Sequence, residues 1–82
     1  MRSYESLMRQ ADSLIKFAHI SDDKISGVVI EENYCTIGEE RHYYRTARIN
    51  LKNGNHITIR DDSSFDCTDE HWNTIDSRDL LS

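Results

Sequence analysis

Apolar residues recur at intervals of three and four over residues 4–18, and this spacing predicts an amphipathic helix. Ser3 is placed to cap its first turn, which carries Glu5. Lys16 and His19 follow in the last turn, where a basic group is favourable. The stripe also fits a coiled-coil heptad for two to three repeats, which is short for a coiled coil, so we expect packing on a sheet. The apolar positions are Tyr4, Leu7, Met8, Ala11, Leu14, Ile15 and Ala18.

The next apolar positions follow patterns typical of β-strands. Residues 25–37 form the first such segment, and the run at residues 28–30 (Val-Val-Ile) is apolar on both faces. A strand of this kind needs cover on both sides of the sheet. Gly27 beside the run indicates a bulge or a close approach of another backbone, and residues 38–40 (Gly-Glu-Glu) indicate a turn. Residues 42–51 then alternate cleanly and predict the second strand.

Asn53-Gly54 is the strongest turn signal in the chain and predicts a hairpin between residues 42–51 and 56–60. A two-residue loop would place apolar residues opposite polar ones. A three-residue loop with a left-handed Gly54 keeps the apolar residues together on one face, so we prefer this register. It pairs Ile49 with Ile57 and Ala47 with Ile59.

Beyond the hairpin, the polar run at residues 61–64 predicts a loop. Phe65 is expected to anchor the following segment on the core. Thr68 is placed to cap a short helix that runs to Ile75 and carries Trp72 and Ile75 on one face.

These elements predict one small α+β domain over residues 1–82. Its N-terminal amphipathic helix packs on a three- to four-stranded antiparallel meander, and a short helix lies near the C-terminus. A small SH3-like or Sm-like barrel preceded by a helix is the alternative, since bent strands would also use a segment that is apolar on both faces.

Composition narrows the class of protein. No apolar run approaches the roughly 20 residues needed to cross a bilayer, and the N-terminus lacks the pattern of an export signal. We therefore expect a cytoplasmic protein without membrane contact. In that compartment Cys35 and Cys67 are expected to be reduced core residues, with a single disulfide between them as the alternative.

The net charge of −5 is distributed unevenly along the chain. Residues 61–82 carry seven carboxylates and one arginine, whereas residues 31–60 carry four carboxylates and five basic residues. Segregation of this kind bears on the choice of partner and not on the fold.

Motifs for catalysis are absent from the sequence. The four histidines accompany no nucleophile elbow and the three glycines form no phosphate loop, so we expect neither an enzyme nor a cofactor. Cys67 and His71 lack the second pair of ligands that a structural zinc site requires. Residues 62–73 echo the spacing of a calcium loop, but cysteine replaces its glycine and asparagine its closing glutamate, so no metal site is expected.

One hypothesis for function is the binding of nucleic acid or a phosphate ligand by the hairpin 42–60. In the preferred register, aromatic and basic side chains point away from the core, where they can stack on bases and contact phosphates. The negative net charge makes this the second hypothesis, and a solvated sheet face is the simpler interpretation. The residues concerned are Tyr44, Arg48, His56 and Arg60.

The leading hypothesis is a small acidic protein-binding module. Carboxylates around an aromatic anchor can steer the protein onto a basic, nucleic-acid-binding surface and occlude it, as a mimic of nucleic acid. The short, acidic profile without proline is similar to that of many inhibitor and accessory proteins of phages and mobile elements, which suggests a host or defence complex as target. We expect a monomer or a weak dimer. The partner-binding residues are Asp61, Asp62, Asp66, Asp69, Glu70 and Trp72.

Overall fold

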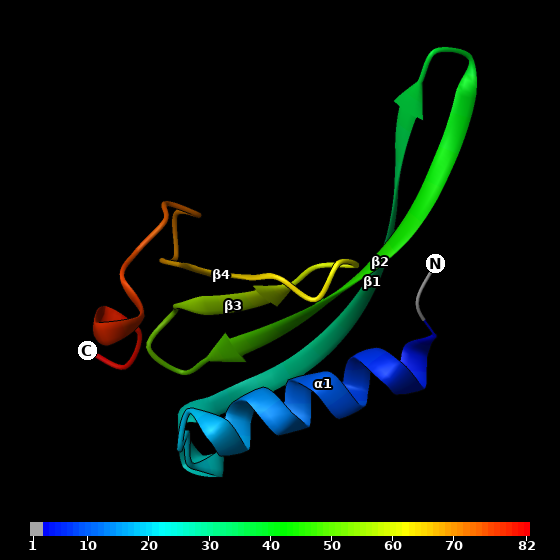
Figure 1. Ribbon diagram of the computed structural model, residues 1–82. Helices are drawn as coiled ribbons and strands as arrows, with labels where there is room; N and C mark the ends of the chain where they lie inside the picture. The colour runs from blue at the N-terminus through cyan, green and yellow to red at the C-terminus, as the bar shows by residue number, and fades with distance from the viewer. Residues whose placement is uncertain (1–2) are drawn as a thin grey trace.

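The computed structural model describes residues 3–82 and shows a four-stranded antiparallel sheet with one helix packed against one face (Figure 1). The strands follow one another in the order β1-β2-β3-β4, which confirms the predicted α+β meander. Because β1 and β4 are edge strands, the sheet does not close into the barrel considered as an alternative. The elements are α1 (Tyr4–Phe17), β1 (Ile25–Ile37), β2 (Glu40–Leu51), β3 (His56–Ile59), β4 (Phe65–Thr68) and short 3₁₀ helices at Asp22–Lys24 and Ser77–Asp79.

Helix α1 forms where the apolar spacing predicts it. The hydroxyl of Ser3 accepts a hydrogen bond from the N–H of Ser6 at 3.1 Å and caps the first turn. Leu7 and Ala11 are fully buried and α1 contacts β1 and β2, so the apolar stripe packs on the sheet, as expected. The helix ends at Phe17, which leaves His19 outside the last turn in a left-handed conformation, contrary to its expected place.

The sheet face toward α1 carries the core. Its buried strand residues alternate along β2 and β3, and the register pairs Ile49 with Ile57 and Ala47 with Ile59, as predicted. Gly54 closes the three-residue loop at a φ of 95°, in the left-handed region that favours glycine. The core consists of Leu7, Ala11, Ile20, Ala47, Ile49, Leu51, Ile57, Ile59, Cys67 and Leu80.

Within residues 3–82, no helix covers the opposite side of the sheet, which is called the open face below. Val29 points to this side and is exposed, so the expected cover on both sides of residues 28–30 is wrong. A single helix can cover one face of a sheet and leaves the other to solvent. The predicted bulge at Gly27 is confirmed, since the register of β1 against β2 shifts between Ile25 and Gly27.

The segment after the hairpin departs from the prediction. Residues 65–68 form strand β4, and residues 69–73 form a turn in place of the helix expected from Thr68 to Ile75. The carboxylate of Asp69 accepts hydrogen bonds from the N–H groups of His71 and Asn73, and this local capping competes with helix formation. Ile75 packs on the core while Trp72 turns to the open face, so the two do not share a face.

Two residues expected in the core are exposed. Phe65 keeps 51% of its surface in solvent, because it lies on edge strand β4 beyond the strands that α1 covers. Cys35 is exposed on β1, whereas Cys67 is buried, and both are free thiols. In the part of the chain from Ser3 to Ser82, no helix is long and apolar enough to span a membrane.

The outer halves of β1 and β2 form a hairpin that projects away from the rest of the domain (Figure 1). β3 pairs with β2 only from Ala47 to Asn50, so residues 31–46, called the arm below, lie beyond the four-stranded part of the sheet. Tyr34, Ile37 and Tyr43 on the arm are exposed. The arm contributes to the longest dimension of the molecule, 43 Å.

Candidate functional site

Both predicted sets of binding residues meet on or beside the open face. His56 on β3 stacks on Trp72, with ring centroids 4.0 Å apart and planes inclined by 8°. Trp72 comes from the turn after β4 and holds a φ of 65°, which is uncommon for a bulky residue. Thr68 also faces His56, with its hydroxyl 3.4 Å from Nδ1. The C-terminal segment thus contacts the hairpin face through an aromatic stack.

Arg48 is the central cation of the open face. Its guanidinium lies 2.7 Å from a carboxylate oxygen of Glu31 on β1, and its Nε donates to the side-chain oxygen of Asn50 at 3.1 Å. The guanidinium also lies 5.4 Å from the centroid of the Trp72 ring, within the range of cation–π attraction. Arg48 is therefore charge-compensated and fixed in place. The sequence interpretation missed Glu31 and Asn50, although Glu31 is a diagonal cross-strand neighbour once the β1–β2 register is known.

The positive charge of Arg60 is also compensated by a carboxylate. It forms an ion pair with Asp66, a residue of the C-terminal segment, across β3 and β4. Tyr44 is nearby and lines a shallow groove with Arg60, Asp61 and Asp62. The two arginines expected to contact phosphates thus each have a carboxylate partner, which weakens the nucleic-acid hypothesis.

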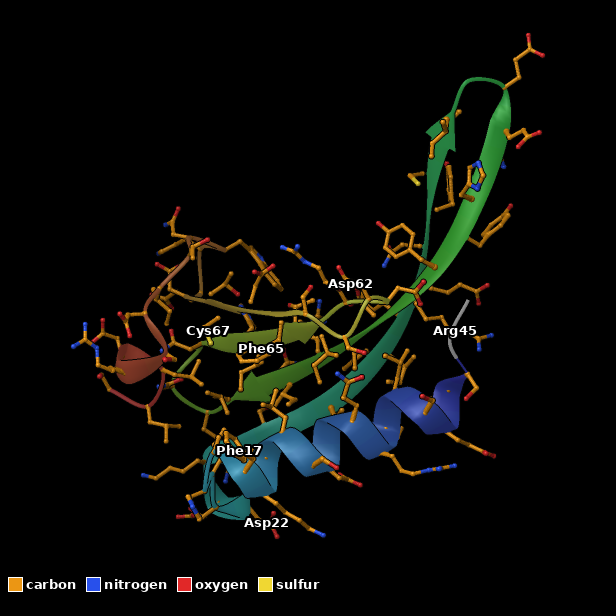
Figure 2. All side chains as sticks on the ribbon, viewed as in Figure 1. Phe17, Asp22, Arg45, Asp62, Phe65 and Cys67 are labelled. Carbon is orange, nitrogen blue, oxygen red and sulfur yellow. The ribbon has the colours of Figure 1, made fainter. Side chains whose placement is uncertain are left out.

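Five carboxylates follow edge strand β4 and the turns at its two ends. Figure 2 shows Asp62 at the β3–β4 turn, beside the base of the arm. Strand β4, which separates the two turns, has four residues, on the order of 13 Å at an extended rise of about 3.3 Å per residue. This acidic edge consists of Asp61, Asp62, Asp66, Asp69 and Glu70.

Backbone and hydroxyl donors hold the carboxylates at the ends of the acidic edge. Asp62 accepts hydrogen bonds from the hydroxyl and the N–H of Ser64, and these bonds lower the pKa of its carboxyl. The carboxylate of Asp69 accepts hydrogen bonds from the N–H groups of Asn73 and His71. These bonds, the one from Asn73 most of all, lower the pKa of its carboxyl. The two charges are held at defined positions.

We expect these turns to weaken in acid. A carboxyl whose pKa is lower in the folded chain than its ordinary value of about 3.9 stabilises the fold above that pH, and the contribution is lost as the pH falls through the lowered pKa. The melting temperature of the protein should therefore fall below about pH 4. The variant Asp69→Asn keeps an acceptor oxygen but does not titrate, so its melting temperature should depend less on pH over this range. An equal dependence in both proteins would contradict the assignment.

A second concave surface lies between α1 and the edge of β4. Phe17, which is 85% exposed, lines this apolar groove together with Phe65 and Leu81 (Figure 2). The sequence interpretation missed this surface because it assigned Phe65 to the core. The signal available was Phe17, an aromatic residue outside the apolar stripe of α1.

Among residues 3–82, no three or more histidine, cysteine, aspartate and glutamate side chains are grouped so that they could hold a metal ion. Comparisons with protein-family models, with curated proteins and with solved structures found no significant match to this chain. The function is therefore argued from the geometry of its own surfaces.

Proposed function

We propose that this protein binds a protein partner through the acidic edge and occludes a basic, nucleic-acid-binding surface on it. The observation that supports this proposal is the fixed placement of Asp62 and Asp69 at the two ends of β4. Each is held by its own turn, and neither lies within ion-pair distance of an arginine or lysine among residues 3–82. Both charges remain available to a partner.

Preorganisation makes such a surface effective. Carboxylates already ordered by backbone donors lose little conformational freedom on binding, so more of the interaction energy appears as affinity. Their field also accelerates encounter with a basic surface. Trp72, which is 54% exposed, lies at the border of the acidic edge and supplies an aromatic anchor of the kind enriched at binding hot spots.

The proposed context is inhibition of a host or defence complex by a small protein of a phage or mobile element, acting by binding and not by catalysis. Charge segregation supports this context, since residues 61–82 carry seven carboxylates and a single arginine. Direct binding of nucleic acid by Tyr44 and the arginines has less support, because a phosphate would have to displace Glu31 from Arg48 or Asp66 from Arg60.

The test is a variant in which the acidic edge is neutral but its turns are kept. An asparagine side chain retains the carbonyl oxygen that accepts the turn hydrogen bonds, so the fold should survive the loss of charge. A matched control removes the same number of charges elsewhere. The edge variant is Asp61→Asn, Asp62→Asn, Asp66→Asn, Asp69→Asn and Glu70→Gln, and the control is Glu5→Gln, Asp12→Asn, Asp22→Asn, Asp23→Asn and Asp79→Asn.

Each immobilised protein is incubated with lysate of its source cells, and the captured proteins are quantified by mass spectrometry. The wild-type protein and the control should capture a basic partner. The edge variant should bind this partner with an affinity at least about tenfold lower, and its binding should depend less on salt. Duplex DNA should compete for the captured partner. Equal capture by all three proteins, equal loss in both variants, or no competition by DNA would each contradict the proposal. Retention of nucleic acid itself, increased in the edge variant, would favour the alternative.

A further inference from the structure

The apolar groove between α1 and β4 is a surface that the proposed function leaves unused. It consists of two adjoining hollows, and both are lined by Leu14, Phe17 and Phe65. The hollow nearer the C-terminus encloses about 340 Å³ and is also lined by Leu81 and by the buried core residue Ile57. Phe17, Phe65 and Leu81 are exposed. Exposed apolar side chains that are grouped in this way mark a binding site, whereas single ones are ordinary.

Hydrogen bonds hold both ends of the groove. At one end, the side-chain amide of Gln10 donates to the carbonyl of Ser63 at 3.2 Å, which ties the β3–β4 turn to α1. At the other end, the side-chain amides of Asn53 and Asn55 each donate to the carbonyl of Leu80 at 2.9 Å. The groove is therefore preformed, and a ligand that enters it needs to order little of the protein.

The wall that α1 provides has the length of two turns of a second helix. It runs from Gln10 to Phe17, about 10 Å at the α-helical rise of about 1.5 Å per residue. Apolar residues at i, i+4 and i+7 of another helix span the same distance, and such a row anchors a helix in a groove. An extended peptide has less room, because Ile75 already donates its N–H to the carbonyl of Cys67 on the outer edge of β4 at 3.0 Å. The shape of the groove therefore favours a helix.

Carboxylates flank the two ends of the groove. Asp62 precedes Ser63, which lines the groove at the β3–β4 turn, and Asp79 lies between two lining residues near the C-terminus. Among residues 3–82, neither carboxylate forms an ion pair with a lysine or an arginine. Of the described residues that line the groove, only Arg78 is charged, and it pairs with Asp76 at 3.2 Å. The ends of the groove therefore attract basic residues beside an apolar row.

The polar residues on the α1 wall are uncharged, namely Gln10 and Ser13. Arg9 and Lys16 lie about 180° around the helix from the fully buried Leu7, so both face solvent and not the groove. A second copy of the chain is a poor occupant, because its net charge is −5 and β4 carries the acidic edge beside the groove. The charges thus favour a basic partner of a different kind.

We propose that the apolar groove binds an amphipathic helix of a partner protein, in which basic residues flank the apolar row. The apolar row contacts Phe17 and Phe65, and the basic residues approach Asp62 at one end and Asp79 at the other. This surface shares only Asp62 with the acidic edge. The proposal goes beyond the proposed function and does not depend on it.

Four synthetic peptides of about four helical turns serve as probes. In the first, leucines at intervals of three and four form the apolar row and lysines fill the other positions. The second has glutamate in place of lysine, and the third has serine in place of leucine. The fourth has proline at one central lysine position, which breaks the helix. Each peptide carries a fluorophore and is titrated with the full chain, and fluorescence anisotropy measures the affinity.

The leucine–lysine peptide should bind with a Kd below about 100 μM, and each of the other three at least about tenfold more weakly. Equal binding of the serine peptide would show attraction by charge alone, and equal binding of the glutamate peptide would show that charge plays no part. Equal binding of the proline peptide would show an occupant that is not helical. Each of these results, or a Kd of the first peptide above about 100 μM, would overturn the proposal. Because synthetic peptides replace the partner, the outcome is independent of the capture experiment on the acidic edge.

A matched pair of substitutions on α1 places the binding site. Phe17→Ala removes part of the groove and should weaken binding of the leucine–lysine peptide at least about fivefold. Tyr4→Ala removes an aromatic side chain that is 58% exposed on the same helix but outside the lining of the groove, and should change the affinity by less than about twofold. Circular dichroism checks that both variants are folded. Equal effects of the two substitutions, or a wild-type dimer that Phe17→Ala dissociates in sedimentation equilibrium, would overturn the proposal.

Discussion

Replacing Leu7 by alanine is expected to lower the free energy of unfolding by about 2–5 kcal/mol. Leu7 is fully buried, and it is the largest fully buried side chain of the only α-helix that covers the sheet within residues 3–82. A small domain has about 5–15 kcal/mol of stability in total, so this change removes a large fraction of it and should lower the melting temperature clearly. Urea denaturation followed by far-ultraviolet circular dichroism measures the change.

Phe17→Ala is the control on the same helix. It removes a larger apolar side chain, but Phe17 is exposed, so we expect a change within about 0.5 kcal/mol. A cost for Phe17→Ala as large as that for Leu7→Ala would show that the apolar groove, and not the face of α1 toward the sheet, dominates stability. That result would contradict the core described here.

Replacing Gly54 by alanine is expected to cost about 1–3 kcal/mol, the second largest effect of a single substitution. Gly54 holds a left-handed conformation, and an added Cβ would lie 3.3 Å from the Cβ of Glu70. The loop also matters beyond its own turn, because the amides of Asn53 and Asn55 each donate to the carbonyl of Leu80 at 2.9 Å. A shift of the loop would therefore loosen the C-terminal segment.

Gly38→Ala separates the two causes. Gly38 is also left-handed, at a φ of 64°, but an added Cβ would meet nothing within 4 Å. Its cost should be limited to the backbone strain of about 1 kcal/mol, and the excess for Gly54→Ala reports the contact with Glu70. Thermal and urea denaturation of both variants measure the difference. A larger cost at Gly38 than at Gly54 would contradict this account.

The elements that were predicted correctly are those in which neighbouring residues along the chain carry the signal. The spacing of α1, the alternation of β2 and the turn at Asn53-Gly54 are local patterns, and each formed where it was expected. The register of the β2–β3 hairpin followed because one choice of loop length keeps Ile49 and Ile57 on the same face.

The segment after the hairpin was predicted less well because competing local options lie close in free energy. Asp69 can begin a helix or cap a turn, and pairing of β4 with β3 favours the turn. The hydrophobicity of Phe65 predicts a core residue, but its burial depends on how much of the sheet α1 covers. Neither outcome is encoded in the local pattern.

The candidate site shows the same division. The acidic residues and the hairpin residues were both identified from composition and alternation, as two separate surfaces. The stack of His56 on Trp72 and the ion pair of Arg60 with Asp66 join the C-terminal segment to the hairpin. Among the acidic residues considered, Asp66 thus pairs with a hairpin arginine, whereas Asp62 and Asp69 are held by turns of their own.

By itself, the sequence determined the α+β class, the order of the elements as far as the β2–β3 hairpin, the register of that hairpin and the segregation of charge, because periodicity, turn chemistry and charge act over a few residues. Only the tertiary structure decided which surfaces are free. β1 and β2 have 13 and 12 residues against four each in β3 and β4, and this mismatch in length lets the arm project beyond the shorter strands. The burial of a side chain and the pairing of a strand depend on contacts between segments that are distant in the sequence. Their free energy cannot be predicted from the pattern of neighbouring residues.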